Sequence, residues 1–388
     1  MTEILLLALI PLAIWLGWWL ARSASTRRER KRNRLFSNQY FQGLNYLLNE
    51  QPDKAIQVFL EMAEVNKDTV ETHMALGSLF RRRGEVDRAI RLHQNIISKH
   101  SLDERQRTRA LLELGEDYMR AGLFDRAERL FSELIERNVH APSALWNLLD
   151  IYQQEREWQQ ALNQAARLDR LGTPGMSVYM AHFCCELAEA ELAAGKPEAA
   201  RRHLRQARRH DPESIRAQFI QARIAAHGGD HVSAMECYEQ IAALEADYLP
   251  DLLDAYFDSA RRAGLEARAR AQLETWSEAY DGISVVLRKA EFLQEEQGLG
   301  AAAAYLARTL SDRPSVRGLD RLMAMKQEGG PDIESGEEVL RTVAQRLLAS
   351  QSTYQCSHCG FSGQAHNWQC PSCKKWSTVR VIRGVLGE

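Results

Sequence analysis

Residues 76–96 read LGSLFRRRGEVDRAIRLHQNI, and the fold of the chain can be worked outward from this stretch. Gly77 and Phe80 lie one turn apart on the same face of a predicted first helix, where a small residue lets a second helix come close. Gly84 suits the reversal that follows, because glycine adopts the left-handed conformation at a helix end at little cost. Ala89 marks the close contact on the returning helix, and Ile96 is the last marker. The stretch therefore predicts a helix–turn–helix unit.

The same pattern recurs along most of the chain. The markers Gly43, Tyr46 and Ala55 lie 34 residues before their counterparts in the quoted stretch. Residues in the phase of Ala89 are Ala55, Ala127, Ala161, Ala200, Ala234, Ala269 and Ala302, and residues in the phase of Gly84 are Gly122, Gly195, Gly229 and Gly264. A period of 34 residues with these markers is the signature of an array of helical hairpins.

The pattern resembles the tetratricopeptide repeat. Repeat starts near residues 36, 70, 108, 142, 181, 215, 250 and 283 give about eight units over residues 36–315. The resemblance implies an all-α superhelical solenoid. Each unit of such an array contacts only its neighbours, so the chain can be long without one large core.

Composition favours a binding protein over an enzyme. The chain has 388 residues, with 50 basic and 52 acidic side chains, so its balanced charge gives no general sign of a nucleic-acid partner. No serine–histidine–aspartate set, paired-carboxylate motif or phosphate-binding loop stands out. We therefore expect no enzymatic activity.

Residues 4–21 predict a membrane anchor. These 18 residues contain no charged side chain, which is near the minimum for a helix that crosses a hydrocarbon core ~30 Å thick. Three tryptophans near the end of the run suit the water–lipid boundary. Residues 22–35 then hold seven basic side chains and one acid. By the positive-inside rule, residues 1–21 span the membrane with the N-terminus outside, and the rest of the chain is cytoplasmic.

Two alternatives to the anchor are a cleaved signal peptide and a buried helix. A signal peptide carries its basic residues before the apolar run, whereas here they follow it. The basic segment at residues 22–35 is a juxtamembrane segment in this interpretation. It either sets topology alone or also holds the first repeat near anionic lipid, at about 1 kcal/mol per basic residue.

Tetratricopeptide arrays bind partners on the concave face, which the first helices line. We expect partner-binding residues at Tyr40, Met74, Arg81, Arg82, Met119, Arg120, Trp146 and Arg223. Methionine and arginine beside aromatic residues suit an adaptable peptide groove. The alternative for Trp146 is a place in the core. Cys184, Cys185 and Cys237 fall inside predicted helices and are expected to be buried, inert thiols.

After Pro314 the repeat pattern fades. A break at residues 329–331 is followed by apolar residues with helical spacing, namely Val339, Leu340, Val343, Leu347 and Leu348. We interpret residues 316–350 as a capping helix and linker.

Residues 351–388 predict a small metal-binding domain. Cys356 and Cys359 form one Cys-x-x-Cys pair, Cys370 and Cys373 form a second, and ten residues separate the pairs. Two such pairs in a cytoplasmic chain indicate four thiolates around one ion. A domain of this size lacks the core to fold alone, and metal binding makes up the deficit. His358 and His366 lie nearby, but four thiolates already complete a tetrahedron.

With Tyr354, Gly360, Trp368 and Pro371, this segment resembles a rubredoxin-type fold. True rubredoxins hold a much longer segment between the two pairs, which buries an iron centre for electron transfer. A structural role is therefore favoured here over a redox role. Four sulfurs suit zinc or iron, and the closed site favours zinc.

The order of anchor, repeats and cysteine domain resembles the lipopolysaccharide assembly protein B family of Gram-negative bacteria over essentially the full length. The resemblance implies a non-enzymatic adaptor in the inner membrane. It implies three protein partners: the membrane-bound ATP-dependent protease FtsH, the lipid A deacetylase LpxC as the client to be degraded, and an inner-membrane protein that senses lipopolysaccharide.

Two other functions remain open from the sequence. One is a redox or iron-sensing membrane protein that uses the four cysteines. The other is a nucleic-acid-binding zinc ribbon, with a small basic surface made by Lys374, Lys375, Trp376, Arg380 and Arg383. Solvated charge is the simpler account of that surface, so we expect no nucleic-acid partner.

Overall fold

The computed structural model describes residues 69–100, 102–328 and 335–388, together with residues 42, 43, 45, 46, 51, 54 and 58. They fall into two compact units, Met1–Arg156 and Glu157–Glu388. The predicted anchor at residues 4–21, the basic segment at residues 22–35 and most of the first predicted repeat lie outside the described residues. Among the described helices, none is long and apolar enough to span a bilayer.

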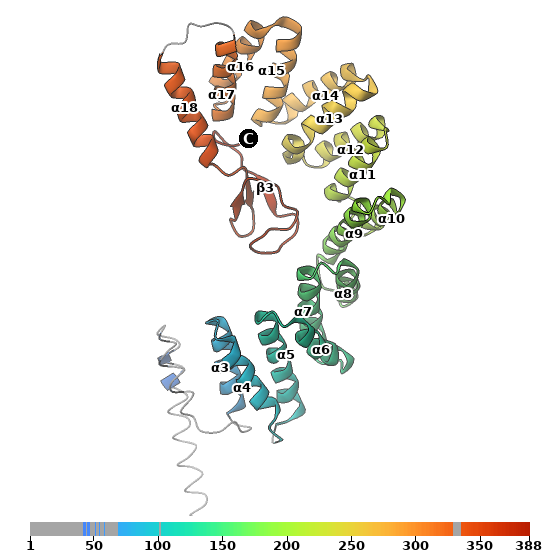
Figure 1. The fold of residues 1–388 in the computed structure, drawn as a ribbon, viewed down its shortest axis with the longest axis vertical. Helices are drawn as coiled ribbons and strands as arrows, with labels where there is room; N and C mark the ends of the chain where they lie inside the picture. The colour runs from blue at the N-terminus through green and yellow to red at the C-terminus, as the bar shows by residue number, and fades with distance from the viewer. Residues whose placement is uncertain are drawn as a thin grey trace, which may run out of the picture. The chain divides into compact units, whose positions relative to one another are not determined.

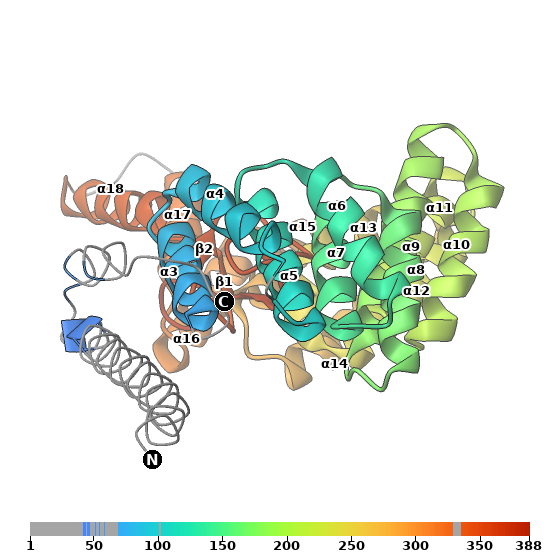
Figure 2. The same ribbon diagram turned by 90° about the horizontal axis from the view of Figure 1, so that it is seen from below.

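The described part of the first unit consists of helical hairpins (Figures 1 and 2). Its long helices are α3 (Val70–Arg82), α4 (Val86–Ile97), α5 (Glu104–Arg120), α6 (Phe124–Glu136) and α7 (Ala141–Gln154). Within this unit, consecutive helices from α3 to α7 pack on one another, and α3 and α5 also contact each other, as first helices of successive repeats do.

The second unit continues the array. Its helices are α8 (Trp158–Arg170), α9 (Met176–Ala193), α10 (Pro197–His210), α11 (Ile215–His227), α12 (His231–Leu244), the short 3₁₀ helix η1 (Ala246–Tyr248), α13 (Leu249–Ala263), α14 (Glu266–Ala279), α15 (Ile283–Gln297), α16 (Leu299–Asp312), α17 (Val316–Glu328) and α18 (Ser335–Ser350). From α9 onward the first helices of successive repeats also contact one another, as α9 does α11 and α13 does α15.

The repeat markers take the positions that the sequence predicts. The alanines of the second helices from Ala89 to Ala302 are 0% exposed. Gly84, Gly122, Gly195, Gly229 and Gly264 all have φ between 68° and 83°, the left-handed conformation that ends the first helix. At Gly77 an added Cβ would lie 2.4 Å from the ring of His93, so a larger residue would push the two helices apart.

Residues 316–350 hold more regular structure than predicted. We expected one capping helix and a linker, but α17 precedes α18 and packs against α15 and α16. Gly318 and Met325 of α17 are buried. Their positions match neither the glycines that end first helices nor the alanines of second helices, so the repeat pattern does not predict this helix. In α18, Leu340 and Val343 are 55% and 48% exposed, so part of the expected apolar face is open in the described structure.

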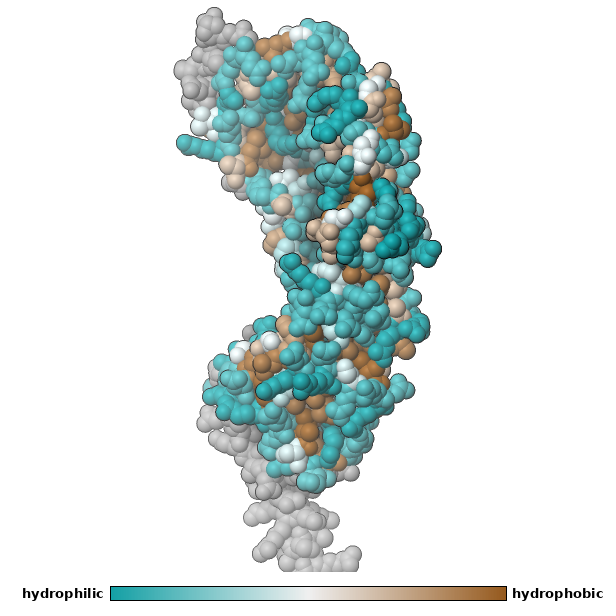
Figure 3. All heavy atoms as spheres, turned by 45° about the vertical axis from the view of Figure 1, so that its right-hand side comes forward, coloured by the Kyte–Doolittle hydropathy of each residue, from teal (hydrophilic) through white to brown (hydrophobic). Residues whose placement is uncertain are grey.

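Hydrophobic side chains show on the surface as separate patches within a largely hydrophilic face (Figure 3). Each repeat buries its apolar stripe against its neighbours, so no single large core is needed. In the second unit the core runs through successive clusters, one around Cys184 and Leu204 and another around Tyr238 and Tyr256.

The final segment forms a small antiparallel sheet with strand order β2–β1–β3. Its strands are β1 (Tyr354–Cys356), β2 (Ser362–Gly363) and β3 (Val379–Val381). Tyr354 pairs with Gly363 on one side and with Val381 on the other. Cys356, the first cysteine of the first pair, is the last residue of β1, so the sheet positions this pair at one end of that strand.

Candidate metal centre and the repeat face that holds it

Four thiols converge at the end of the sheet. The sulfur atoms of Cys356, Cys359, Cys370 and Cys373 all lie within 4.8 Å of one another. The Sγ atoms of Cys356 and Cys373 are 3.8 Å apart, and those of Cys359 and Cys370 are 3.7 Å apart. A tetrahedron with metal–sulfur bonds of ~2.3 Å has edges of about 3.8 Å, so the sulfurs fit one four-coordinate ion.

The two cysteine pairs have the same backbone construction. The amide of Gly360 donates to the carbonyl of Cys356 (3.0 Å), and the amide of Lys374 donates to the carbonyl of Cys370 (2.9 Å). Gly360 and Lys374 also share the left-handed conformation, with φ of 77° and 59°. Each turn thus aims two sulfurs toward one point.

The contacts among the thiols shift their pKa values in opposite directions, down for Cys356 and Cys359 and up to about 11 for Cys373. At Cys373 a hydrogen bond from the Lys375 amide lowers the pKa, but burial and the neighbouring cysteine sulfurs outweigh it. Burial alone would raise the pKa of Cys356, but its hydrogen bond with Thr378 Oγ1 and those with backbone amides lower the pKa to about 6. Cys356 and Cys370 are buried, and Cys359 is exposed. The chain therefore supplies the donor set of a closed structural site with one side near solvent.

Within the described residues, the group of potential ligands does not include His358 or His366. It consists of the four cysteines. The ring of His366 instead packs against Tyr248, Tyr354 and Trp368. Burial, and then the positive charge of Arg380, lower the pKa of His366 to about 4, so the ring is neutral at pH 7.

The metal domain, residues 351–388, packs on the first helices of the second unit (Figure 1). Trp376 is 6% exposed and stacks on His182 of α9, with ring centroids 4.6 Å apart. Phe183 and Trp158 meet the same indole edge-on at 6.0 and 6.3 Å. Trp376 is therefore an anchor in an aromatic pocket of the repeats.

A second tryptophan makes a parallel contact further along the array. Trp368 stacks on Tyr248 of η1, with centroids 5.7 Å apart, and meets Phe219 of α11 at 5.9 Å. Tyr248 also lies under the guanidinium of Arg380 and accepts a 2.6 Å hydrogen bond from it. Two indoles, one from each side of the second cysteine pair, thus fix the domain.

Polar contacts extend the docking face to α13, α15 and α17. The hydroxyl of Tyr354 donates to Asp251, and Arg383 pairs with Asp247. The carboxylate of Glu388 accepts hydrogen bonds from Ser284 and Arg317. First helices from α9 to α17 therefore all contribute to holding this domain.

Arg216 of α11 is a buried cation of this face. It is 4% exposed, its guanidinium lies 5.7 Å from the ring centroid of Trp376, and it donates to Glu186 and Glu189 at 2.8 and 2.7 Å. Buried cations require such partners. The surface of the repeats beneath the Trp376 indole therefore contains a cation, Arg216, together with two acidic partners.

The basic surface suggested for nucleic-acid binding is not available in this arrangement. Arg380 is paired with Glu245 and Arg383 with Asp247, while Trp376 is buried. Lys374 and Lys375 remain exposed. Three of the five residues of that surface therefore contact the repeats in the docked domain.

The predicted partner-binding residues are dispersed. Tyr40 lies outside the described residues. Met74 is 2% exposed and packs with Val70 and Ile96, so it belongs to the core, and its predicted partner contact is corrected. Arg82 and Arg120 are exposed, and Met119 and Trp146 are half-buried.

Arg81 and Arg223 each have partners within the chain. Arg81 pairs with Glu113, Glu116 and Asp117 of the next first helix, at 2.7–2.8 Å. Arg223 pairs with Glu189 at 3.3 Å and is 54% exposed. Of the set, Arg223 is the residue that lines a cavity.

Sequence reasoning missed His182, Phe183, Arg216 and Tyr248, which receive the metal domain. They lie in repeats, where aromatic and charged residues are common, and no spacing rule connects them to residues more than 100 positions later. Cys184 and Cys185 are buried as predicted, and burial raises the pKa of Cys184 to about 11. Cys237 is half-buried, and burial raises its pKa as well.

Comparison with known proteins agrees with this architecture. Family models described as tetratricopeptide repeat match residues 72–108, 112–171 and 185–248, and one described as rubredoxin metal binding domain matches residues 354–380. A solved tetratricopeptide repeat protein from Parabacteroides merdae is 14% identical, with a TM-score of 0.33, and the match covers 72% of this chain and 99% of that one. The fold and the four-thiol site define a tetratricopeptide-repeat protein with a C-terminal rubredoxin-type metal domain.

Two curated relatives narrow this class. Lipopolysaccharide assembly protein B of Escherichia coli (strain K12) is 36% identical over 99% of both chains. The protein of the same name from Haemophilus influenzae is 30% identical over 97% of this chain and 98% of its own. The chain belongs to the lipopolysaccharide assembly protein B family.

Proposed function

We propose that this protein is a non-enzymatic adaptor that regulates lipopolysaccharide synthesis. In this role it brings the lipid A deacetylase LpxC to the membrane protease FtsH for degradation, and an inner-membrane protein that senses lipopolysaccharide restrains it. The observation that carries the proposal is the full-length match to relatives named lipopolysaccharide assembly protein B. The repeat array supports it, since arrays of this class are scaffolds for protein partners.

The proposal includes a place in the cell. Residues 1–21 anchor the chain in the inner membrane with the N-terminus outside, and residues 22–35 lie at the cytoplasmic surface near membrane lipid. The uncharged run and the basic residues that follow it support this arrangement. A membrane-fixed array meets a protease in the same membrane at a raised effective concentration.

We propose that the metal is zinc and that its role is structural. The closed set of four thiols and their spacing support one tetrahedral ion, and iron is the alternative. Metal analysis of the purified full chain distinguishes the two. Zinc in equimolar amount, in a colourless protein, is expected. Iron with reversible thiolate absorption changes would instead support an iron-sensing or redox function.

The adaptor function is tested in Escherichia coli cells depleted of their own relative. Expression of this chain is expected to restore rapid loss of LpxC after protein synthesis is stopped, as followed by immunoblot. The loss should disappear when FtsH is inactivated. Stable LpxC in cells that contain the folded chain would contradict the proposal.

A further inference from the structure

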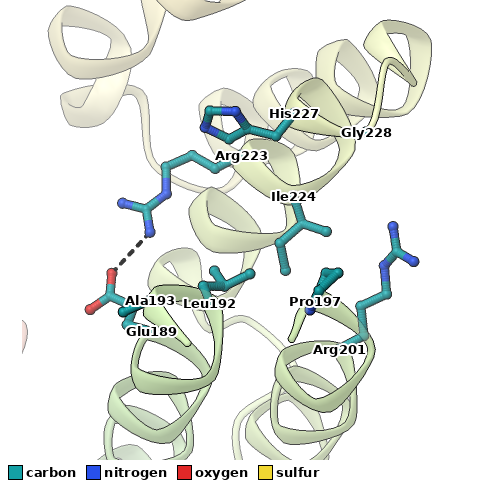
Figure 4. Close-up of a pocket in the computed structure, with 9 residues that line it drawn as sticks. All are labelled: Glu189, Leu192, Ala193, Pro197, Arg201, Arg223, Ile224, His227 and Gly228. Carbon is teal, nitrogen blue, oxygen red and sulfur yellow. Dashed lines mark hydrogen bonds and ion pairs between the residues drawn. The ribbon is translucent and has the colours of Figure 1, made fainter. Parts of the chain in front are cut away.

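A cavity of about 720 Å³ opens in the second unit where α9 ends, α10 begins and α11 ends (Figure 4). Leu192, Ala193 and Ile224 supply an apolar lining, with Pro197 beside them. In Figure 4, Ile224 points into the space between the two helix ends below it. The volume exceeds that of any single residue and suits a short stretch of peptide, with one apolar side chain against Leu192 and Ile224.

The rim of this cavity is cationic. Arg201, Arg223 and His227 line it, and the acid in the lining is Glu189. The Glu189 carboxylate already accepts hydrogen bonds from Arg216 and Arg223. Arg201 and Arg223 thus bring two cations to a lining with one acid, and Glu198, outside the lining, pairs with Arg201.

A line of arginines leads away from the cavity along α10. Arg201, Arg205 and Arg208 are spaced i, i+4 and i+7, which places them on one face of the helix over about 10 Å. The helix contains five arginines and one acid, Glu198, which pairs with Arg201. We call Arg201, Arg205 and Arg208 the α10 stripe.

The exposed arginines of this unit are of two kinds, those with a carboxylate partner and those without one among the described residues, such as Arg209 and Arg261. Arg262, Arg268 and Arg270 each have a carboxylate partner. Arg205 and Arg208 are exposed, and neither has an ion pair among the residues that the structure describes. The whole chain carries a net charge of −2, so this positive surface is local.

We propose that the cavity and the α10 stripe together bind an acidic segment of a partner protein. One apolar side chain of the segment enters the cavity between Leu192 and Ile224. Carboxylates that follow it pair with the stripe. An apolar anchor in a pocket with charges around it is the usual construction of a peptide site.

The surface suits a protein segment better than other anionic partners. A helix that lies on a membrane presents large apolar side chains beside its basic residues. The outer face of α10 has none among the exposed large hydrophobic residues of the described chain. Single-stranded nucleic acid is held by aromatic side chains on which bases stack, and no phenylalanine, tyrosine or tryptophan lines this cavity. An acidic peptide needs neither feature.

The inference goes beyond the proposed function. It assigns a site on the helix ends and on the outer helix α10, separate from the residues that hold the metal domain. It requires no particular partner of the adaptor, and its test uses purified protein only.

The test uses the full chain and fluorescein-labelled 12-residue peptides. Each peptide carries one leucine followed by three glutamates at successive spacings of three or four residues. Matched peptides replace the glutamates with glutamine or the leucine with serine. Two variants challenge the site: Ala193→Trp fills the cavity, and Arg205→Gln with Arg208→Gln removes the stripe.

Matched control variants are available nearby. Ala194→Trp adds the same side chain one position beyond the cavity lining. Arg167→Gln with Arg170→Gln removes two exposed arginines from the last turn of α8. Circular dichroism melting verifies that each variant is folded before binding is measured by fluorescence anisotropy.

We expect the leucine–glutamate peptide to bind with an affinity about tenfold above that of either matched peptide. Each site variant should lose about tenfold, each control should stay within about twofold, and added salt should weaken binding. Equal binding of the glutamate and glutamine peptides would overturn the proposal. So would vesicles of phosphatidylglycerol, or an oligothymidylate, that bind as tightly and lose binding in the same variants.

Discussion

Gly77 and Gly115 show how one hydrogen atom in place of a side chain sets the spacing of two helices. Glycine inside a helix normally costs up to ~1 kcal/mol relative to alanine. Here a Cβ at Gly115 would lie 2.5 Å from the ring of Phe131, and one at Gly77 would lie 2.4 Å from the ring of His93. Close packing of the hairpin therefore outweighs the intrinsic preference of the helix.

We expect Gly115→Ala to lower the free energy of unfolding by about 1–3 kcal/mol, because the aromatic ring has to move. The matched control is Gly300→Ala in α16, where the added Cβ meets nothing within 4 Å. That change should raise stability by about 0.5–1 kcal/mol through helix propensity alone. Urea unfolding of both variants measures the difference, and equal effects would refute the packing account.

Two histidines make the docked domain sensitive to acid. Burial, and then Arg216, lower the pKa of His182 to about 3, and His366 is lowered to about 4. The unfolded pKa is about 6.5, so between pH 6.5 and these values the unfolded chain binds more protons, and stability falls as pH falls. The loss between pH 7 and pH 5 is about 1–2 kcal/mol for each histidine.

The measurement is denaturant unfolding at pH 7 and pH 5 with the metal in excess. Replacing both rings, as His182→Asn with His366→Asn, should reduce the pH dependence by about 2–4 kcal/mol. The comparison with the intact chain separates the histidines from the protonation of the thiols, which both proteins share. An unchanged pH dependence in the variant would show that the rings do not control it.

At the scale of elements, the metal domain has separate sets of residues for folding and for docking. Its own core contains Tyr354, Cys356, Cys370 and Val379. Trp376 is outside that cluster and contacts His182 and Phe183 of α9 instead. The two properties should therefore respond to different substitutions.

Trp376→Ala should weaken docking by about 3–5 kcal/mol while leaving metal binding intact. The indole leaves a pocket on the repeats, but no sulfur loses a partner. Limited proteolysis between residues 329 and 353 measures release of the domain, and metal analysis measures retention of the ion. Lys375→Ala, at an exposed neighbour, is the control, and loss of metal in Trp376→Ala would show that the indole belongs to the domain core.

Cys370→Ser tests the four-thiol centre. The Cys370 side chain is 0% exposed and lies 3.7 Å from the sulfur of Cys359. Removing one of four thiolates should abolish stoichiometric metal and unfold residues 351–388, since binding supplies roughly 10–16 kcal/mol in comparable small sites. An equimolar bound metal in this variant would contradict a site that needs all four sulfurs.

The repeats and the metal ligands could be predicted from sequence because both depend on local rules. A left-handed glycine after a helix and two Cys-x-x-Cys turns each have a physical reason that a few residues express. Helix α17 could not be predicted in this way, because Gly318 and Met325 match neither the repeat markers nor the cysteine pairs. The residues that receive the metal domain, His182, Phe183, Arg216 and Tyr248, could not be predicted either. Their role depends on contacts with residues 351–388, which are far away in the sequence.

At the scale of the whole molecule, two units divide between α7 and α8, inside the repeat predicted to start near residue 142. The docked domain belongs to the second unit alone, where it covers part of the first helices. The first unit keeps exposed residues such as Arg82 and Arg120. A partner that binds first helices would therefore contact exposed repeat side chains in the first unit, whereas in the second unit the metal domain already covers part of these helices.

The membrane part of the proposed function has its own prediction. A chain that lacks residues 1–21 should fold its repeats and bind metal, but at native expression it should fail to restore LpxC turnover. Loss of the anchor removes the raised effective concentration near FtsH. The measurement is the LpxC half-life beside that of cells with the intact chain. Full turnover without residues 1–21 would refute recruitment by the anchor.

The docking of residues 351–388 onto helices α9 to α17 also fixes an order of events during translation. The ribosome releases those helices before it completes the two cysteine pairs, so His182 and Tyr248 lack their contacts with Trp376 and Trp368 until the end of synthesis. A stalled nascent chain would display these rings to chaperones and proteases. We therefore expect a chain without residues 351–388 to be cleaved by proteases at the uncovered helices more readily than the full chain.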